Sequence, residues 1–232
     1  LFMRNWEYGI KGSQCPNRIE KKKKKKVGKL LGIDVIGIDF VEEYRTKVFD
    51  VFLEGLKKGL TPNPDILCNR EIKFNVFLNE AKKMGADMIA TGHYAKIAKY
   101  NDHYVLDTPK DSSKDQAYFL HALSSEQLSH AIFPLADLTK KEVREIAKEH
   151  NLSVSDKKDS TGICFIGNQR FDEFITQHLK AIPGDIIDES GKVIGKHKGL
   201  ICYTLGQRKG IGLGGIKETE SAGHIHNPWY AA

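Results

Sequence analysis

The stretch Gly85–Lys96 reads GADMIATGHYAK and decides the fold class. Its apolar part, Met88–Thr91, has the length of a short buried strand, and this strand ends at Gly92 and His93. In α/β proteins with parallel sheets, ligands bind beyond the carboxyl ends of the strands. The stretch therefore predicts a functional edge of a sheet at Gly92 and His93.

The segments before this stretch alternate between strands and helices. Leu1–Arg4 and Asp34–Phe40 (DVIGIDF) are predicted to be strands, the second of them buried. Apolar residues recur at helical spacing across Val41–Lys58 and Arg70–Met84, and a glycine follows each of these helices. Strands and helices in alternation predict an α/β fold built on a parallel sheet.

The composition indicates a globular protein without a membrane segment. Of the 232 residues, 40% are hydrophobic and 28% are charged, and no apolar run approaches the roughly 20 residues that a membrane helix needs. The net charge of +6 is carried entirely by the run Lys21–Lys26. The charge is therefore weak evidence for a nucleic-acid partner. Such a run is typical of a solvated helix face, with a nucleic-acid contact as the alternative.

Short β elements dominate the later part of the chain. Hairpins are predicted over Tyr94–Asp107 and Asp185–Lys196, and a further strand over Leu200–Thr204. The chain changes character after a polar, turn-rich segment that ends at Gly167. We therefore expect two domains, residues 1–167 and a small β-rich domain of residues 168–232.

Cys68 is the first residue that could carry chemistry. It follows the proline-containing stretch Thr61–Asp65, where two prolines predict a rigid extended loop, and it lies directly before the helix expected from Arg70. A helix N-terminus stabilises a thiolate and lowers the pKa of the thiol. Asp65 lies three residues earlier and could move protons beside it. The alternative is a buried structural cysteine with Asp65 as a helix N-cap.

Cys164 is the second candidate. It lies between Gly162 and Gly167, and a thiol between glycine turns is accessible to a partner. Two accessible thiols indicate sulfur or redox exchange, and the alternative for Cys164 is a packed cysteine at the start of a strand. The four cysteines are widely spaced and fit a reducing compartment, without zinc-binding spacing. Of the other two, Cys202 is expected in the core and Cys15 in a loop without a role.

Two further patterns are interpreted as accidental. Gly210–Gly215 matches the GxGxxG pattern of dinucleotide-binding proteins, but no helix is predicted after it. His224 and His226 share a face of an extended chain, but two histidines without a third ligand rarely bind a metal. No metal site is therefore predicted. Lys114, Asp115 and Gln116 are, by themselves, typical of an ordinary helix start.

Taken together, these stretches resemble one family, the tRNA-specific 2-thiouridylases (MnmA or TrmU family). The pair TPNPDILCN and STGICFIG is highly specific, and the matching segments follow the order of the family across almost the whole chain. They are LFMRNWE (Leu1–Glu7), GLTPNPDILCNREIKF (Gly59–Phe74), GADMIATGHYAK (Gly85–Lys96), SKDQAYFL (Ser113–Leu120), KKDSTGICFIG (Lys157–Gly167) and YTLGQRKGIGLGG (Tyr203–Gly215).

The resemblance implies ATP-dependent 2-thiolation of the wobble uridine of tRNA. The C2 oxygen of uracil is adenylated, and sulfur then displaces AMP. On this resemblance Cys164 receives sulfur as a persulfide, and Cys68 attacks that persulfide, which leaves a transient Cys68–Cys164 disulfide. Asp65 is the acid/base group. The implied cofactor is ATP, with Mg²⁺.

The resemblance also implies the binding residues and partners. Met3 and Gly92 would line the adenine-nucleotide site. Residues that would meet the flipped target base or other parts of the tRNA are Asn63, Pro64, Asp65, His93, Lys114, Asp115 and Gln116. The implied partners are tRNA and an upstream persulfide carrier protein. We expect a monomer without a membrane partner, in the cytoplasm or, in a eukaryote, in an organelle such as the mitochondrion.

The family pattern contains two parts that this sequence does not. An SGGxDS pyrophosphate loop would precede Leu1, and a C-terminal β-barrel would follow Tyr230. The expected fold is therefore a PP-loop domain, of the adenine-nucleotide α-hydrolase-like type, without its first strand and helix. Two alternatives to a thiouridylase stay open: a catalytically incomplete tRNA-binding remnant, and a thiol–disulfide protein that uses Cys68 and Cys164 without ATP.

Overall fold

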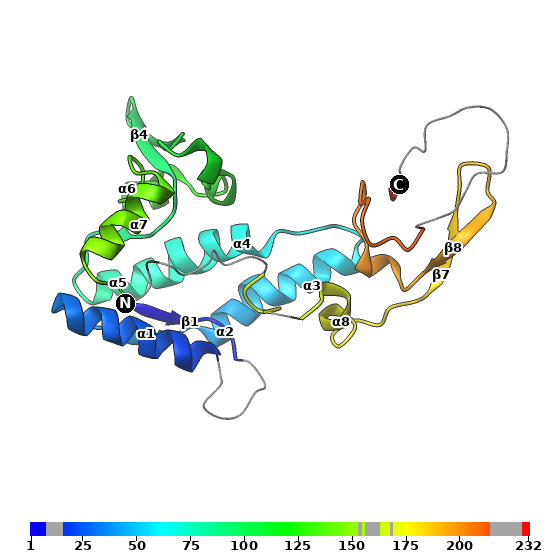
Figure 1. Ribbon diagram of the computed structural model, residues 1–232, viewed down its shortest axis with the longest axis horizontal. Coiled ribbons are helices and arrows are strands. Elements are labelled where there is room, and N and C mark those ends of the chain that lie inside the picture. The colour runs from blue at the N-terminus through cyan, green and yellow to red at the C-terminus, as the bar shows by residue number, and fades with distance from the viewer. Residues whose placement is uncertain (8–15, 153–154, 156–162, 168, 214–228) are drawn as a thin grey trace. The chain divides into compact units, whose positions relative to one another are not determined.

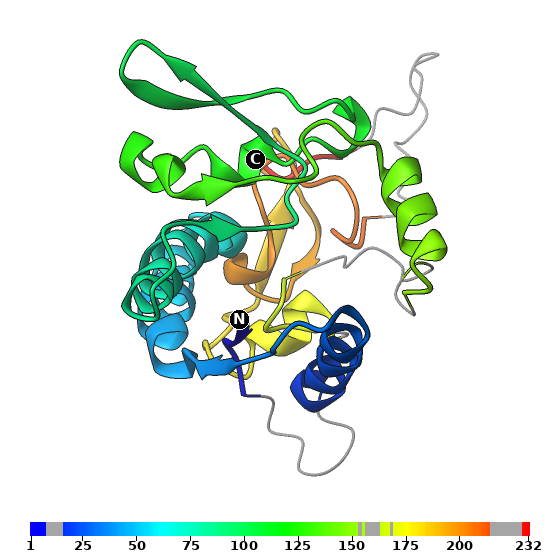
Figure 2. The same ribbon diagram turned by 90° about the vertical axis from the view of Figure 1, so that its left-hand side faces the viewer.

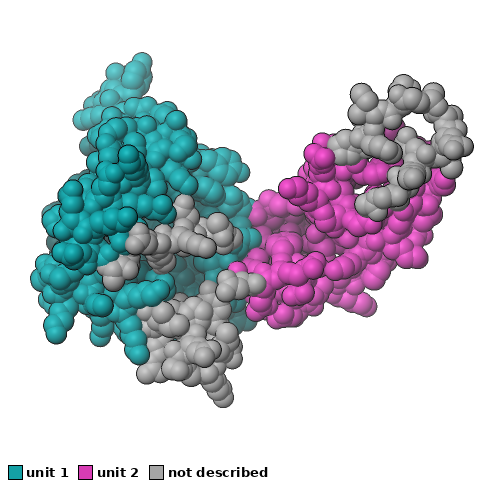
Figure 3. Space-filling view, viewed as in Figure 1, with its two compact units in different colours: residues 1–51, 63–165 teal, residues 52–62, 166–232 magenta. Residues whose placement is uncertain are grey.

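The computed structural model describes residues 1–7, 16–152, 155, 163–167, 169–213 and 229–232. These residues form two compact units, which Figure 3 shows in different colours. Unit 1 consists of residues 1–51 and 63–165, and unit 2 of residues 52–62 and 166–232. No helix in the described ranges is long and apolar enough to cross a membrane.

Unit 1 is an α/β structure (Figure 1) in which β1–β2 and β3–β6 are parallel pairs and β4–β5 is an antiparallel hairpin. Its elements are β1 (Phe2–Arg4), α1 (Pro16–Leu31), β2 (Gly37–Asp39), α2 (Val41–Tyr44), η1 (Arg45–Phe49), the start of α3 (Asp50–Lys57), α4 (Pro64–Leu67), η2 (Cys68–Phe77), α5 (Leu78–Lys83), β3 (Ile89–Ala90), β4 (Lys96–Tyr100), β5 (His103–Asp107), η3 (Ser112–Lys114), η4 (Ala117–Leu120), α6 (Ser125–Ser129), β6 (Ala131–Ile132) and α7 (Lys140–Glu149).

The parallel pairs confirm the predicted α/β class. β1 pairs with β2, with Phe2 opposite Gly37, and β3 pairs with β6, with Ile89 opposite Ala131. The connection from β1 to β2 contains α1, as a parallel crossover requires. Strand β2 is shorter than expected, and its residues are partly or fully exposed. The strand expected over Asp34–Phe40 is therefore confirmed only at Gly37–Asp39, and the expectation that it is buried was wrong.

The helix after the two prolines begins earlier than expected. Asn63 is its N-cap, because the Asn63 side-chain oxygen accepts hydrogen bonds from the backbone N–H groups of Asp65 and Ile66. Pro64 occupies the first helical position, where a missing N–H group costs nothing. The prediction of an extended loop over Thr61–Asp65 was therefore wrong from its second proline onward, and Cys68 lies one turn inside the helix.

The helix that starts at Pro64 continues through α4, η2 and α5 but changes its winding. Its η2 part is π-helical, and Phe74 departs from helical geometry with φ −98° and ψ 16°. Near this departure, Nε2 of Gln127 donates 3.0 Å hydrogen bonds to the carbonyl oxygens of Arg70 and Phe74. A side chain from α6 thus satisfies backbone groups where the helix is irregular.

The core of unit 1 joins this helix to the second parallel pair. The buried residues that pack together are Phe74, Leu78, Ala81, Ile89, Ala95, Leu120, Leu128, Ala131 and Phe133. The β4–β5 hairpin, predicted around Asn101, extends from the unit in Figures 1 and 2. Asn101 has φ 52°, a conformation that Asn tolerates in tight turns.

The described part of unit 2 contains the second predicted hairpin together with short helical segments. Its elements are the rest of α3, α8 (Phe171–Ile175), β7 (Gly184–Ile187), β8 (Val193–His197) and η5 (Leu200–Cys202). β7 and β8 pair antiparallel, as expected. The strand expected over Leu200–Thr204 was wrong, because the chain forms a 3-10 turn there. Cys202 is consequently half-buried, whereas the sequence predicted a core position.

Candidate active site

One face of the helix after Pro64 carries most of the polar groups of the candidate site. Asp65, Cys68, Asn69 and Lys73 recur at three- and four-residue intervals, and this spacing places them on the same side of a helix. The side chain of Cys68 is only 5% exposed and that of Asn69 only 2%. Asp65 and Lys73 are half-buried, so the predicted pair of Asp65 and Cys68 is part of a partly buried polar face.

Asn69 fixes the position of this face. Its Nδ2 group donates a 2.7 Å hydrogen bond to the carbonyl oxygen of Phe119 in η4. Its Oδ1 atom accepts a 2.8 Å hydrogen bond from Nζ of Lys73, one turn later. A buried amide with a partner on each side is costly to remove. Asn69 therefore holds the ammonium group of Lys73 in place and ties the helix to η4.

Cys164 meets the site from a distant part of the sequence. The hydroxyl of Tyr44, a fully buried residue at the end of α2, lies 2.8 Å from Sγ of Cys164. The residue after Cys164, Phe165, is 1% exposed and packs edge-to-face on Tyr44 and Phe49. Trp6 contacts the same aromatic rings. Burial of Phe165 thus anchors Cys164 beside α2.

The electrostatics of Cys68 differ from the expectation for a residue before a helix. Burial raises the pKa of the Cys68 thiol to about 12, and the charge of Lys73 offsets only part of this increase. The expected lowered pKa at a helix N-terminus was therefore wrong, because Cys68 lies inside the helix and is desolvated. Burial also raises the pKa of Asp65, again opposed by Lys73. The resting state holds a neutral thiol near a carboxylate of increased basicity.

Cys164 has a different environment from Cys68. The residue is exposed as a whole, but desolvation of its thiol raises the pKa, and the hydrogen bond from Tyr44 acts in the opposite direction. The charges of Asp65 and Lys73 also shift this pKa, as they shift that of Cys68. The structure therefore brings the three residues predicted to be catalytic, Asp65, Cys68 and Cys164, into one electrostatic environment.

His93 stands at the end of the predicted sheet edge and is neutral. Its Nε2 atom lies 3.5 Å from Nζ of Lys73, and its Nδ1 atom lies 2.8 Å from the hydroxyl of Thr91. An ammonium group can only donate, so Nε2 accepts and Nδ1–H donates to Thr91. Burial, followed by the charge of Lys73, lowers the pKa of His93 to about 3. At neutral pH His93 therefore carries no positive charge.

The segment Lys114–Gln116 is held against the residue that follows His93. The backbone N–H of Tyr94 donates a 3.0 Å hydrogen bond to Oε1 of Gln116, and the N–H of Gln116 donates a 2.8 Å bond to the carbonyl oxygen of Tyr94. Asp115 is exposed, and its Oδ1 atom accepts a bond from the N–H of Ala117. The structure thus brings Lys114–Gln116 together with His93.

Met3 and Gly92 belong to two different parallel pairs. Met3 lies in β1 opposite Ile38, and Gly92 follows β3 by two residues. Gly92 is exposed, and a Cβ atom built on it would meet nothing within 4 Å, so open space adjoins this backbone. Such a position fits the close approach of a nucleotide to backbone N–H groups. Among the described side chains no cluster of His, Cys, Asp or Glu could hold a metal ion.

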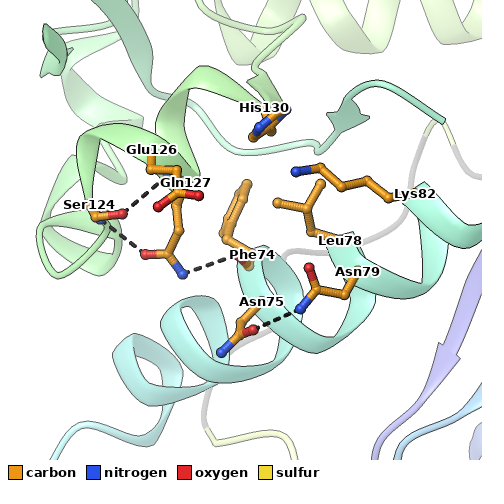
Figure 4. A pocket seen from close by; sticks show the side chains of 9 residues that line it. All are labelled: Phe74, Asn75, Leu78, Asn79, Lys82, Ser124, Glu126, Gln127 and His130. Carbon is orange, nitrogen blue, oxygen red and sulfur yellow. Dashed lines mark hydrogen bonds between the residues drawn. The ribbon is translucent and has the colours of Figure 1, made fainter.

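A pocket of about 330 Å³ lies on another part of the same helix, as Figure 4 shows. It opens between η2–α5 and α6, and Gln127 reaches across it to the backbone of Phe74. The residues that line it are Phe74, Asn75, Leu78, Asn79, Lys82, Ser124, Glu126, Gln127 and His130. None of the residues predicted to act on a substrate is in this set, so the pocket is separate from the candidate site.

The sequence analysis missed three residues of the site. Asn69 and Lys73 lie within the quoted segment Gly59–Phe74 but were assigned no role, although their spacing from Asp65 already placed them on its face. Tyr44 gave no signal beyond an apolar position in a helix. Other residues singled out from the sequence, namely Cys15, His224, His226 and the end of the GxGxxG match, lie outside the described residues.

Two family models match the chain. The model described as the tRNA methyl transferase HUP domain matches residues 1–168, and the model described as the tRNA methyl transferase PRC-barrel domain matches residues 172–232. These matches confirm the expected fold class, a HUP (PP-loop) domain followed by a small β domain.

Curated relatives match the chain over its whole length. It is 83% identical over 232 residues to the tRNA-specific 2-thiouridylase MnmA 2 of Aliarcobacter butzleri. The matched region covers 100% of the chain and 63% of the relative. It is 49% identical to the tRNA-specific 2-thiouridylase MnmA of Buchnera aphidicola, with 99% of the chain and 62% of the relative covered. The chain thus spans less than two thirds of the length of these relatives.

Proposed function

Because the chain belongs to the family of tRNA-specific 2-thiouridylases, we propose that it takes part in ATP-dependent 2-thiolation of the wobble uridine of tRNA. The observation that carries this proposal is the common electrostatic environment of Asp65, Cys68 and Cys164. Two thiols beside a carboxylate suit the transfer of a sulfur atom. Methyl transfer, which the descriptions of the family models mention, has no evident use for such a pair.

The first stage of the proposed reaction activates the base. The C2 oxygen of uracil attacks the α-phosphorus of ATP, and pyrophosphate leaves with the electron pair of the broken P–O bond. Met3 and the open backbone at Gly92 would contact the adenine nucleotide. Mg²⁺ would accompany the nucleotide and neutralise phosphate charge. The role of this chain in the first stage is to bind and orient the two substrates.

The second stage transfers sulfur. A persulfide on Cys164, loaded by an upstream carrier protein, would attack C2 of the adenylated uracil with its terminal sulfur, and AMP would leave. The thiolate of Cys68 would then attack Sγ of Cys164, form the Cys68–Cys164 disulfide and release the C2 sulfur with its electron pair. A thiol with a pKa of about 12 needs a base for this step. Asp65, whose pKa is raised by burial, would accept the proton.

The residues proposed to contact tRNA lie at the start of this helix and on two other segments of unit 1. Asn63 uses its side-chain oxygen as a helix cap, so its amide nitrogen would meet the target base. Pro64 and Asp65 would complete the wall against a base that has left its stack. On the other side, neutral His93 and the segment Lys114–Gln116 would contact the tRNA. These contacts come from separate elements of unit 1 and would hold one extended ligand.

We also propose a separate role for each of the two domains. Residues 1–167 would form the PP-loop catalytic domain, and residues 168–232 a small β-rich domain that contacts tRNA. We propose that the protein acts in the cytoplasm, because the Cys68–Cys164 disulfide must be reduced after each turnover and a reducing compartment supplies the thiols for this. A monomer is the proposed oligomeric state.

The proposal is tested by sulfur transfer to tRNA with ATP and a persulfide donor, measured as retardation of the tRNA on a mercury-containing gel. The chain is compared with a version extended N-terminally through an SGGxDS loop. Thiolation by the extended version supports the proposal, and a Cys202→Ser version of it should be equally active. If the extended version binds tRNA but does not thiolate it, the catalytically incomplete tRNA-binding remnant is the correct alternative.

A further inference from the structure

The hydroxyl of Tyr44 is buried and contacts the sulfur of Cys164. Tyr44 is 0% exposed, and its Oη atom lies 2.8 Å from Sγ of Cys164. The two residues are 120 positions apart in the sequence, so this contact exists only in the folded chain. Burial, together with the negative charges that Cys164, Cys68 and Asp65 can carry, raises the pKa of Tyr44 far above its ordinary value. The hydroxyl therefore keeps its proton at every physiological pH.

Aromatic packing fixes the direction of this hydroxyl. The ring of Trp6 packs edge-to-face on Tyr44 with centroids 6.3 Å apart, and that of Phe165 does so at 6.2 Å. Trp6 and Phe165 also contact each other, with centroids 5.5 Å apart. A ring enclosed in this way cannot turn its hydroxyl elsewhere without disturbing the cluster. The hydrogen-bonding group is thus held at the sulfur before any substrate arrives.

We propose that Tyr44 is a catalytic residue, a permanent hydrogen-bond donor that stabilises the thiolate of Cys164 and thereby activates it to accept sulfur. A thiolate has no proton and can only accept, so the protonated Tyr44 hydroxyl is the donor of the pair. This inference deepens the proposed function, because it assigns a residue to the loading step that precedes base modification.

The loading step transfers one sulfur atom from the carrier protein to Cys164 and needs no additional oxidant or reductant. The Cys164 thiolate attacks the terminal sulfur of the persulfide on the carrier protein, and a new S–S bond forms at Cys164. The S–S bond of the carrier breaks, and the carrier cysteine leaves as a thiolate with the electron pair. The proton on the terminal sulfur stays there, so Cys164 ends as a persulfide. Tyr44 donates its hydrogen bond throughout and is neither oxidised nor reduced.

Other groups near Cys164 act on its charge in both directions. Asp65 raises the pKa of the Cys164 thiol and Lys73 lowers it, while desolvation is the largest cause of the increase. Cys68 lies in the same environment and is a neutral thiol at physiological pH. Tyr44 is the side chain that opposes desolvation by direct hydrogen bonding to the sulfur, and the backbone N–H of Cys164 contributes a smaller effect in the same direction. Loss of the Tyr44 hydroxyl should therefore raise the pKa of the Cys164 thiol.

The test compares Tyr44→Phe with the wild-type chain and with Tyr100→Phe, which removes the hydroxyl of an exposed tyrosine in the β4–β5 hairpin. Iodoacetamide alkylation of Cys164 is followed by mass spectrometry of its peptide at a series of pH values. We expect alkylation at pH 7 to be about tenfold slower in Tyr44→Phe, with the midpoint of the pH profile at higher pH, and unchanged in Tyr100→Phe.

A second variant guards against a folding artefact. Replacement of Tyr44 by 3-fluorotyrosine strengthens the donor without removing the ring, so alkylation should become faster at pH 7 and the midpoint should fall. Equal profiles for wild type, Tyr44→Phe and the fluorinated chain would overturn the inference. Because alkylation needs neither ATP nor tRNA, failure here is distinguishable from failure of the thiolation assay.

Discussion

The ammonium group of Lys73 lies 3.5 Å from Nε2 of His93, and its charge acts together with burial against protonation of the imidazole. Lys73 is held there by its 2.8 Å hydrogen bond to Asn69, and this bond keeps the positive charge close to the histidine. Burial and this charge together lower the pKa of His93 to about 3. One lysine thus adds to the effect of burial on the pKa of His93 and opposes the effect of burial on the pKa values of Asp65 and Cys68.

The His93 environment predicts a loss of stability in acid. The ordinary histidine pKa is 6.5 and the folded value is about 3, so only the unfolded chain binds a proton between these values. The stability is fully present above pH 6.5 and falls by about 1.4 kcal/mol for each pH unit below it, until the folded pKa is reached. His93→Gln should remove this slope, measured by urea unfolding at several pH values, whereas His103→Gln at an exposed position should keep it.

Lys73→Met should make the site less reactive. Without the ammonium group, the pKa of Cys68 rises further and the thiolate becomes scarcer, since Lys73 is the group that opposes desolvation there. Alkylation of Cys68 at pH 9 should slow several-fold, and His93 should become easier to protonate, as seen in its NMR titration. Lys82→Met removes an exposed lysine from the same helix and should change neither. An unchanged His93 titration in Lys73→Met would contradict the assigned contact.

Cys164→Ser should abolish thiolation by the extended chain while tRNA affinity stays within about twofold, because the substitution removes only a sulfur nucleophile. Affinity is measured by filter binding and thiolation on the mercury-containing gel. Cys202→Ser, in η5 of unit 2, serves as the matched control. A large loss of tRNA binding in Cys164→Ser would show that Cys164 supports the tRNA surface rather than the sulfur relay.

Asn63→Ala should destabilise the start of the helix that carries the site. The variant loses the side-chain oxygen that accepts bonds from the N–H groups of Asp65 and Ile66, which is worth about 1 kcal/mol. Thermal unfolding measures the effect, and Asn63→Asp should restore most of the stability because aspartate is an equally good N-cap. Asn75→Ala, farther along the same helix, is the control for loss of an asparagine.

Several elements could be predicted from local sequence because their signals are local. A strand within Met88–Thr91, the hairpin around Asn101 and the helix over Val41–Lys58 follow from apolar runs, turn residues and helical spacing. The strand is shorter and less buried than predicted, since it covers only Ile89–Ala90 and only Ile89 is buried. The early start of the helix at Pro64 could also have been predicted from neighbouring residues, since asparagine followed by proline is a helix-start signal. It was overlooked because two prolines were interpreted as a loop.

By itself, the sequence determined the α/β class and the identity of the thiols and carboxylate in the candidate site. Tertiary structure alone decided their chemical state. Cys68 is a neutral thiol because packing buries it, and Cys164 is paired with Tyr44 across 120 positions of sequence. A pattern of residue types reports periodicity along the chain, whereas desolvation and charge–charge distances depend on which surfaces meet when the chain folds.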